Sequence, residues 1–375
     1  MKKNIAQFIG TIQDGGAETL VKDYALMLDK KKINNIIIVY RRNPNSANEK
    51  KMVEQGVKII PIYKSSLTMV TALQKFNYWW LTPYRLKRIL KNENIDVLHI
   101  HMALLNKVAK ISKSIRNIKL FYTCHSIPER YLSPSKMKKE YRAAKKLIQN
   151  NNLRIISLHD DMKKEIDALF NIKNTVVIKN GIDFKRFLSV KDDKLTVRSD
   201  IGIPLDSFVL GHVGRFNAIK NHQFLISIFK EAYKKNPNAF LLMIGDGNLK
   251  SQIETELCKY GLNDHFLILS HRADIPRLLK AMDVFVFPSL AEGLGIALIE
   301  AQVSGLKCVA SDTIPQEAFK TESAIPMSLK KAPSEWCNAI FDNSVKHTPH
   351  GNIADYDMNN EIKKLEMLYL GEYDD

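Results

Sequence analysis

Short apolar runs separated by helix-like segments recur along most of the chain and set its expected architecture. Residues 4–10, 36–40 and 57–62 are the first such runs, and each has the length of a strand. Continuous apolar runs are typical of parallel strands covered on both faces. The pattern therefore predicts an α/β protein with parallel sheets and helical connections. Later runs of this kind are residues 96–101, 120–125, 154–158, 175–178, 207–214, 239–244, 266–269, 284–287 and 308–310.

Residues 281–312 contain the clearest single unit of this pattern. An apolar run at 284–287 ends at a proline and a glycine-containing turn, and a helix-like segment at 296–303 follows. A second apolar run, 308–310, completes the unit. The order of strand, loop, helix and strand predicts a βαβ crossover.

The loop and helix of this unit carry residues suited to a phosphate and a sugar. A helix N-terminus offers unpaired N–H groups and partial positive charge, and Gly293 and Gly295 permit close approach of a ligand. Glu292, just before the helix, can accept hydrogen bonds from sugar hydroxyls. Glu300, about one and a half turns inside it, can hold a ribose diol. An ordinary βα loop with a capping acid accounts equally well for the spacing.

Two other glycine- or cation-containing loops precede predicted helices. Gly15 and Gly16 follow the first apolar run, where they fit a phosphate cradle or simply a tight βα turn. Arg215 and Lys220 lie in the loop after residues 207–214. Together they offer a diphosphate a bidentate guanidinium and a point charge, although surface cations are the plain alternative.

Two histidines end neighbouring strand-like runs. His101 closes the run at 96–101, and His125 closes the next, at 120–125. The carboxyl ends of parallel strands are where open α/β sheets bind ligands. Two histidines at consecutive strand ends favour a functional role, whereas a single one is most often structural.

Charge is distributed unevenly along the 375 residues, which carry a net +16. Residues 1–190 hold 36 Lys and Arg against 15 Asp and Glu, or +21, and residues 191–375 hold 20 against 25, or −5. This asymmetry predicts a polyanionic partner for the first half, either nucleic acid or an anionic membrane surface. A general lysine excess is the alternative.

Two segments of the basic half are candidates for membrane contact. Aromatic residues interleave with basic ones in residues 73–88, and residues 136–146 form a dense basic run. Aromatics at headgroup level and cations on anionic lipid would explain both, but a core-packed helix and a solvated helix face are the alternatives. The aromatics are Phe76, Tyr78, Trp79, Trp80 and Tyr84.

Other features bound the class of protein. The sequence contains no window of 18 apolar residues, so we expect no transmembrane helix. The four cysteines are widely spaced without a CxxC pair, which favours reduced thiols in a cytoplasmic protein and argues against a metal site. The length predicts two domains.

Several short motifs in this sequence resemble those of one enzyme family. Residues 292–300, EGLGIALIE, are similar to the Glu-x7-Glu motif of the retaining family-four, or group 1, nucleotide-sugar glycosyltransferases. The flanking segments AMDVFVFPS and EAQVSGLKCVASD also resemble that family. Within the second segment, EAQVSGL particularly resembles the branch that builds capsular polysaccharide and exopolysaccharide. Further motifs that match the family are Gly15-Gly16-Ala17-Glu18, the segments that end at His101 and at His125, and Asn180-Gly181-Ile182-Asp183. The resemblance extends from Gly15 to Ser311.

The resemblance implies a GT-B fold, with two doubly wound Rossmann-like domains facing across a cleft. Residues 1–187 would form an acceptor-binding domain and residues 188–351 a nucleotide-sugar-binding domain. The final segment, 352–375, would cross back to the first domain through the amphipathic helix at 359–370. Residues 188–206 would be the linker, and residues 320–350 show only weak patterning.

The resemblance also assigns roles to residues. Catalysis would involve His125, Arg215, Lys220 and Glu292. The donor site would comprise Gly15, Gly16, Arg215, Lys220, Gly245, Arg272, Glu292, Gly293, Leu294, Gly295 and Glu300. The acceptor site would contain His101 and His125. The segment around Arg272 departs from the family pattern, because it lacks the usual preceding glycine.

The implied function is transfer of a hexose from a nucleotide sugar, expected to be a UDP-sugar, without a metal or other cofactor. The implied acceptor is a lipid-linked saccharide at the inner face of the cell membrane. We therefore expect a cytoplasmic protein that attaches peripherally to the membrane through its basic half. We expect no nucleic-acid partner. A nucleotide-sugar epimerase, a non-enzymatic polyanion-binding protein and a non-catalytic partner subunit remain the alternatives.

Overall fold

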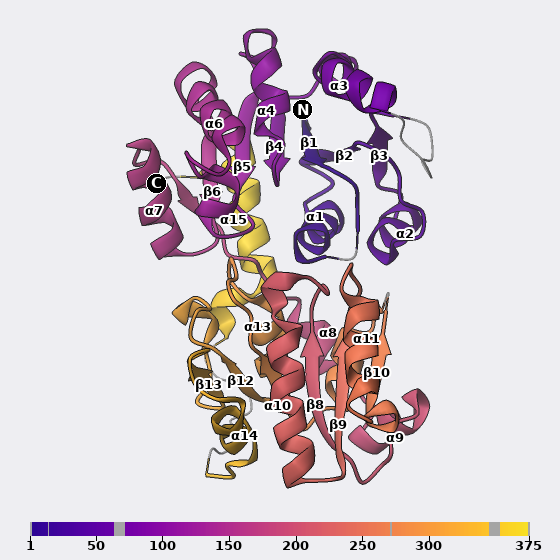
Figure 1. Cartoon of the computed structure of the whole chain (residues 1–375). Coiled ribbons are helices and arrows are strands. Elements are labelled where there is room, and N and C mark those ends of the chain that lie inside the picture. Colours follow the sequence, from indigo (N-terminus) through magenta and orange to yellow (C-terminus); the bar gives the residue numbers. More distant parts are fainter. Residues whose placement is uncertain (1, 14, 64–71, 271, 345–352, 374–375) are drawn as a thin grey trace. The chain divides into compact units, whose positions relative to one another are not determined.

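The structure is a computed structural model that describes residues 2–13, 15–63, 72–270, 272–344 and 353–373 (Figure 1). It divides into one unit of Met1–Gly181 with Asn359–Asp375 and a second unit of Ile182–Met358. The division falls before the predicted boundary at 187 and 188, and the chain returns to the first unit at Asn359 rather than at 352. Residues 182–187 join the second unit because Ile182 pairs with Asp357 and the Arg186 guanidinium donates to the Ala273 carbonyl, at 3.2 Å.

The first unit contains a parallel sheet with the strand order β3-β2-β1-β4-β5-β6-β7. Its middle strands are buried on both faces, as their sequence pattern predicts. The strands are β1 (Lys3–Ile9), β2 (Ile33–Val39), β3 (Lys58–Pro61), β4 (Val97–His101), β5 (Lys119–Thr123), β6 (Arg154–Ser157) and β7 (Val176–Val177).

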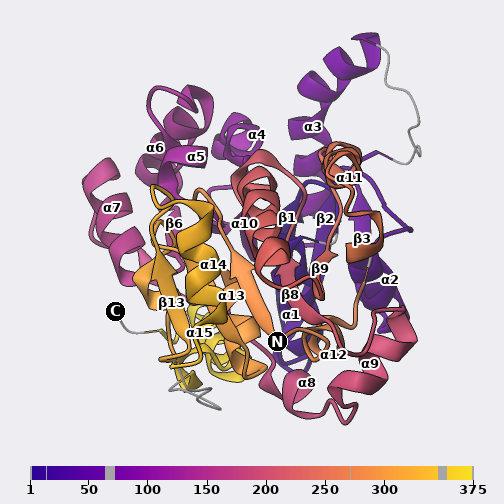
Figure 2. The same ribbon diagram turned by 60° about the horizontal axis from the view of Figure 1, so that its bottom comes forward.

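Helices cover both faces of this sheet (Figures 1 and 2). On one face lie α1 (Gly16–Met27), α2 (Ala47–Glu54) and the final helix α15 (Met358–Leu370). On the other lie α3 (Ala72–Asn92), α4 (Leu105–Val108), the 3-10 helix η1 (Ala109–Ser114), α5 (Pro128–Leu132), α6 (Lys138–Asn151) and α7 (Asp160–Phe170). The predicted amphipathic helix at 359–370 is therefore confirmed, and its apolar face packs on the first unit.

The second unit contains a parallel sheet with the order β10-β9-β8-β11-β12-β13. The strands are β8 (Phe208–Val213), β9 (Ala239–Ile244), β10 (Phe266–Leu269), β11 (Val284–Phe287), β12 (Lys307–Ser311) and β13 (Ala324–Met327). The helices are α8 (Phe184–Leu188), α9 (Lys194–Ile201), η2 (Ala218–Lys220), α10 (His222–Lys235), α11 (Lys250–Lys259), η3 (Asn263–His265), α12 (Ile275–Leu279), α13 (Ile296–Val303), η4 (Gln316–Ala318), α14 (Pro333–Phe341) and η5 (Ala354–Tyr356).

Two segments of this unit contain structure that the sequence pattern did not predict. The linker expected at 188–206 holds α9, and the weakly patterned segment 320–350 holds β13 and α14. The strand β13 lies at the sheet edge and contains a proline, which edge strands tolerate, so its apolar signal is weak. Helix α14 is held by Trp336, which is completely buried.

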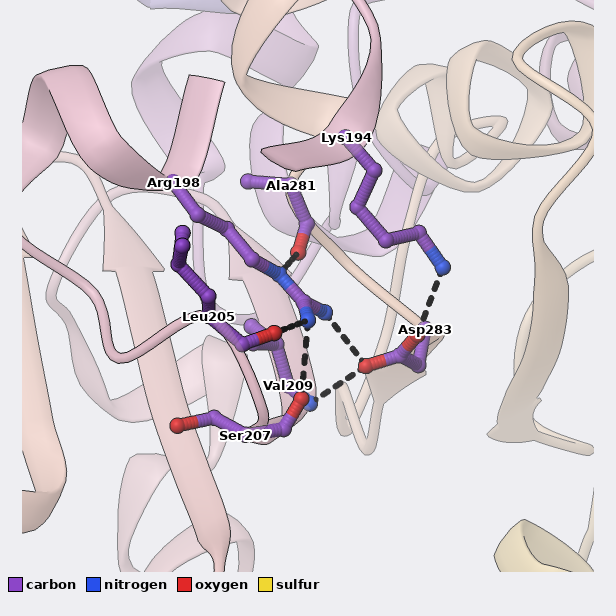
Figure 3. A network of polar contacts seen from close by, with 7 residues as sticks. All are labelled: Lys194, Arg198, Leu205, Ser207, Val209, Ala281 and Asp283. Atoms are coloured by element: carbon purple, nitrogen blue, oxygen red, sulfur yellow. Dashed lines mark hydrogen bonds and ion pairs between the residues drawn. The ribbon is translucent and has the colours of Figure 1, made fainter. Parts of the chain in front are cut away.

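A buried arginine explains why the expected linker is ordered (Figure 3). Arg198 of α9 donates to the carbonyls of Leu205, Ser207 and Ala281 at 2.9–3.1 Å and pairs with Asp283 at 2.6 Å. Asp283 also accepts from the Val209 backbone N–H at 2.7 Å. These bonds tie α9 to the amino ends of β8 and β11.

The aromatic segment predicted at 73–88 lies within α3. Trp80 and Tyr84 expose 62% and 68% of their surface, whereas Leu86 on the same helix is buried. The side chains of Phe76, Tyr78 and Trp79 lie outside the described residues. Among the helices that the structure describes, none is both long and apolar enough to cross a membrane.

Candidate functional site

The strand order of the second unit reverses direction between β8 and β11. The chain proceeds from β8 through β9 to β10 on one side, and then from β11 through β12 to β13 on the other. Open α/β sheets bind ligands at the carboxyl ends of the strands at such a switch point. The loops that leave this point are residues 214–221 after β8 and 288–295 after β11.

An ion pair joins these two loops. The Lys220 ammonium lies 2.6 Å from a Glu292 carboxylate oxygen, with only 16% and 14% of the side chains exposed. The ammonium also lies 4.4 Å from the centre of the Phe287 ring, and the Leu290 N–H donates to the Ile219 carbonyl at 2.8 Å. The structure thus brings together a cation suited to a diphosphate and a carboxylate suited to sugar hydroxyls, both of which the resemblance assigns to the donor site.

The N-terminus of α13 lies on the same loop as Glu292. Gly295 caps this helix without a side-chain hydrogen bond and adopts φ +85°, a left-handed conformation that favours glycine. A Cβ at Gly295 would lie 3.0 Å from the Cγ2 of Ile314. Gly293 and Leu294 are buried beside it, and Glu300 lies within the helix, partly exposed. The helix end therefore presents backbone N–H groups at the switch point.

Arg215 and Gly245 lie at the carboxyl ends of β8 and β9. Arg215 is exposed. A Cβ on Gly245 would lie 2.0 Å from the Gly214 carbonyl oxygen, so only glycine allows the two loops to meet this closely. The Phe216 N–H donates to the Asp246 carbonyl at 2.9 Å and locks the same contact.

Two further cations lie near the carboxyl end of β10. Arg272 makes a bidentate pair with Asp274 at 2.7 and 2.5 Å, and this pairing lowers the pKa of Asp274. Lys250, in the first turn of α11, donates to the Ser270 hydroxyl at 3.0 Å. Sequence reasoning missed Lys250, although a lysine just after Gly245-Asp-Gly247 is a signal that could have pointed to it.

Two buried histidines underlie the Lys220 loop and were also missed. The His212 Nδ1–H donates to the Val286 carbonyl at 2.9 Å, and the His222 ring lies 4.9 Å from that of His212. Burial lowers the pKa of His222 to about 4 and that of His212 well below its usual range. Both imidazoles are therefore neutral near pH 7. His212 lies within an apolar run and His222 at the start of a predicted helix, and neither position gave a chemical signal in the sequence.

The first unit has its own switch point, between β1 and β4. Gly15 caps α1 without a side-chain hydrogen bond, and Gly16 begins that helix. His101 ends β4, and His125 lies two residues beyond β5. The His101 Nδ1 lies 2.8 Å from the His125 Nε2. The predicted histidine pair is thus a direct contact.

Burial decides the charge of this histidine pair. It lowers the pKa of His125 to about 4 and that of His101 well below its usual range, with the neighbouring histidines adding to the effect on His101. Both rings are therefore neutral near pH 7. A neutral imidazole can accept a proton or a hydrogen bond on its free nitrogen.

Sequence comparison identifies both parts of the chain. Residues 193–319 match the family "Glycosyl transferases group 1", and residues 14–186 match "Glycosyltransferase Family 4". The EpsF protein of Bacillus subtilis is 26% identical over 351 residues, covering 90% of this chain and 87% of its own. The UDP-Gal:alpha-D-GlcNAc-diphosphoundecaprenol alpha-1,3-galactosyltransferase of Escherichia coli is 30% identical over 237 residues, 60% of each chain.

Structural comparison agrees on the fold. The crystal structure of HepE from Anabaena in complex with UDP and glucose superposes with a TM-score of 0.79. It covers 98% of this chain and 100% of its own at 18% identity. The predicted fold class, two doubly wound α/β domains of the GT-B type, is confirmed.

Proposed function

This chain is a group 1 glycosyltransferase, and we propose that it transfers a hexose from a UDP-sugar, with retention of configuration, to a lipid-linked saccharide. The observation that carries this proposal is the set of charged and backbone groups at the switch point of the second unit. Arg215, Lys220 and the N-terminus of α13 share that edge with Glu292. No simple structural role requires two cations, an open helix end and a carboxylate at one switch point.

The proposed chemistry follows from charge. The diphosphate gains negative charge as its bond to the sugar breaks, and Arg215, Lys220 and the N–H groups of α13 stabilise that charge. These protein cations supply the charge neutralisation that a metal supplies in other transferases, so we propose that no metal is needed. Glu292 accepts hydrogen bonds from the donor sugar, and Glu300 holds the ribose diol. Gly245, Arg272 and Lys250 border the nucleotide.

The acceptor belongs to the first unit in this proposal. His125 contacts the saccharide, and the fully buried His101 supports His125 from behind, since both of its ring nitrogens are hydrogen-bonded. Gly15 and Gly16 leave the N-terminus of α1 open to a phosphate of the donor. The Escherichia coli relative is named for a diphosphoundecaprenol-linked acceptor. That name and the resemblance of EAQVSGL to the capsular and exopolysaccharide branch support a polyprenyl-diphosphate-linked sugar as acceptor and a surface polysaccharide as the product.

Binding and turnover test the donor assignment. Thermal unfolding is measured with UDP, other nucleoside diphosphates and a panel of UDP-sugars, in the presence of EDTA. We expect UDP and one UDP-sugar to raise the Tm, and Arg215→Ala to abolish the shift. No shift with any nucleotide would contradict the proposal. Conversion of a UDP-sugar without an acceptor would instead indicate an epimerase.

Product analysis tests the chemistry. The purified protein is incubated with the stabilising UDP-sugar and a polyprenyl-diphosphate-linked N-acetylglucosamine, and the anomeric configuration of the product is read by NMR. Retention predicts an α-linked product from an α-linked donor. An inverted product, or activity that requires a divalent metal, would overturn the corresponding part of the proposal.

A basic helical surface on the first unit supports membrane attachment. The 3-10 helix η1 packs against both α3 and α6, these helices expose cations, and Trp80 and Tyr84 protrude from the same layer. Lys110 lies 5.8 Å from the centre of the Trp80 ring. Cations beside exposed aromatics match an anionic lipid headgroup region. Among the exposed cations of this layer are Lys87, Arg88, Lys91, Lys110, Lys113, Arg116, Lys138, Lys139, Arg142 and Lys145.

Vesicle sedimentation tests this attachment. We expect the protein to bind phosphatidylglycerol vesicles at low salt and not phosphatidylcholine vesicles. The triple variant Lys87→Gln, Arg88→Gln, Lys91→Gln should lose about three contributions of roughly 1 kcal/mol each. The control triple changes the exposed Lys191, Lys259 and Lys330 of the second unit to Gln. Equal binding by both triples would contradict the assigned surface.

A further inference from the structure

A continuous chain of hydrogen bonds runs from the partly exposed His125, through buried side chains, to the final helix. Four polar side chains on three neighbouring strands point to the same face of the sheet, the one that α1 and α15 cover, because paired residues and residues two apart on a strand share a face. They are Gln7 on β1, His99 and His101 on β4, and Thr123 on β5. Gln7, His99, His101 and Thr123 are fully buried. Tyr369 of α15, also fully buried, completes the set.

The distances of this chain leave no gap. The His125 Nε2 lies 2.8 Å from the His101 Nδ1, and the His101 Nε2 lies 2.7 Å from the Gln7 Oε1. The Gln7 amide then donates to the Tyr369 hydroxyl at 3.0 Å. That hydroxyl lies 2.5 Å from the His99 Nδ1, and the His99 Nε2 lies 2.7 Å from the Thr123 hydroxyl.

The position of each proton in the chain follows from the Gln7 amide. A carbonyl oxygen only accepts, so the Nε2 of His101 must carry a proton and donate it to Gln7. Because His101 is neutral, its Nδ1 has a lone pair and must accept from the Nε2–H of His125. His125 is neutral too, so its Nδ1 carries a lone pair and no proton.

That last nitrogen has no partner in the protein. Among the described residues, nothing bonds to the His125 Nδ1, although the atom is enclosed. A buried acceptor without a partner is less costly than a buried N–H without one, which agrees with the lone pair being there. A lone pair accepts from a hydroxyl and repels an anionic phosphate oxygen. This end of the chain therefore suits a sugar hydroxyl.

We propose that Gln7 and Tyr369 are positioning residues that hold His125 in the Nε2–H tautomer, with Nδ1 ready to accept a hydrogen bond from a sugar hydroxyl. The identity of the hydroxyl rests on the proposed transferase function, whereas the tautomer does not. The final helix thereby acts on the acceptor-side histidine through Gln7 and His101. An inverted Gln7 amide would reverse every bond and place the proton on Nδ1.

The tautomer is measurable in the full chain without any substrate. Protein labelled with ¹⁵N-histidine is studied by long-range ¹H–¹⁵N correlation at neutral pH, and His125→Asn identifies the His125 signals among the 10 histidines. We expect one neutral tautomer with a protonated Nε2 and an unprotonated Nδ1. A protonated Nδ1, or rapid exchange between tautomers in the wild-type protein, would overturn the proposal.

Two variants test the path. Gln7→Met removes the acceptor of His101, and Tyr369→Phe removes the acceptor of the Gln7 amide. Both should convert the single His125 tautomer into an exchanging mixture. The matched control is Tyr122→Phe, because the buried Tyr122 hydroxyl has no partner in the described structure and belongs to a side chain on the opposite face of β5. It should leave the His125 signals unchanged.

Kinetics separate positioning from folding. With the acceptor and donor that the wild type uses, Gln7→Met should lower kcat on the order of tenfold, comparable to the loss of outer hydrogen-bond partners in metal sites. KM for the nucleotide sugar should remain unchanged. An unaltered kcat with a mixed tautomer would overturn the positioning role. If the wild type shows the expected tautomer but transfers no sugar, the proposed function fails and the tautomer assignment stands.

Discussion

At the scale of single residues, the ion pair between Lys220 and Glu292 is the most informative contact in the second unit. The two charges are mostly shielded from water and 2.6 Å apart, so each sets the environment of the other. A diphosphate arriving at Lys220 must share that ammonium with the carboxylate. Removal of Lys220 should therefore weaken UDP binding, whereas removal of Glu292 should not.

We expect Lys220→Gln to weaken UDP binding about tenfold, or roughly 1.4 kcal/mol, because a cation is lost. Glu292→Gln should bind UDP at least as tightly as the wild type, since Lys220 no longer shares its charge with a carboxylate. The kcat/KM for the UDP-sugar should fall about tenfold or more. Calorimetric titration with UDP and steady-state kinetics measure the two effects. Equal losses of UDP affinity in both variants would show that the pair is only structural.

At the scale of elements, the network around Arg198 decides whether α9 docks on the second sheet. The Arg198 side chain is 4% exposed and reaches three backbone carbonyls besides Asp283, as Figure 3 shows. Lys194 on the same helix also pairs with Asp283, at 2.6 Å, but is 45% exposed. The two cations share one carboxylate yet differ in burial, which makes them a matched pair for experiment.

Arg198→Met should destabilise the second unit by about 3 kcal/mol, because it leaves Asp283 and three carbonyls with fewer partners in a buried place. Lys194→Gln should cost less than about 1 kcal/mol, as exposed ion pairs generally do. Urea unfolding followed by tryptophan fluorescence measures both changes. A loss in the lysine variant as large as in the arginine variant would refute this account of how α9 is held.

At the scale of the whole molecule, both units bury neutral histidines. The pKa values of His125 and His222 are lowered to about 4 by burial, and those of His99, His101 and His212 are lowered well below the usual range. An unfolded histidine takes up its proton near pH 6.5. These groups therefore add stability that is complete above pH 6.5 and is lost as the pH falls towards the folded pKa.

The free energy of unfolding should thus decrease between pH 6.5 and 5 by up to about 2 kcal/mol for each of these histidines. Urea unfolding at a series of pH values measures the slope. His222→Phe is the control, because the His222 ring lies edge-on to Phe216 at 4.7 Å, where a phenyl ring can take its place. Its slope should be shallower. A wild-type stability independent of pH in this range would contradict neutral burial.

The sequence by itself determined the α/β class, the strands and the glycine loops. Continuous apolar runs and glycine-containing turns are local signals, because burial and backbone conformation act on neighbouring residues. These signals located the strands β1 to β12 closely, and the motif from Glu292 to Glu300 indicated the family. The same signals missed α9, β13 and α14. A helix held by one buried arginine, such as α9, and an edge strand with a proline, such as β13, carry little local pattern.

The tertiary structure alone decided which of the candidate residues touch. Lys220 meets Glu292, 72 positions away, and Gln7 meets Tyr369, 362 positions away. Such contacts depend on the order of the strands and on where the final helix packs, which no local pattern encodes. His99 illustrates the limit, because in the sequence it is one polar residue within an apolar run. Only the alternation of β1, β4 and β5 beneath α15 makes it part of a hydrogen-bonded chain.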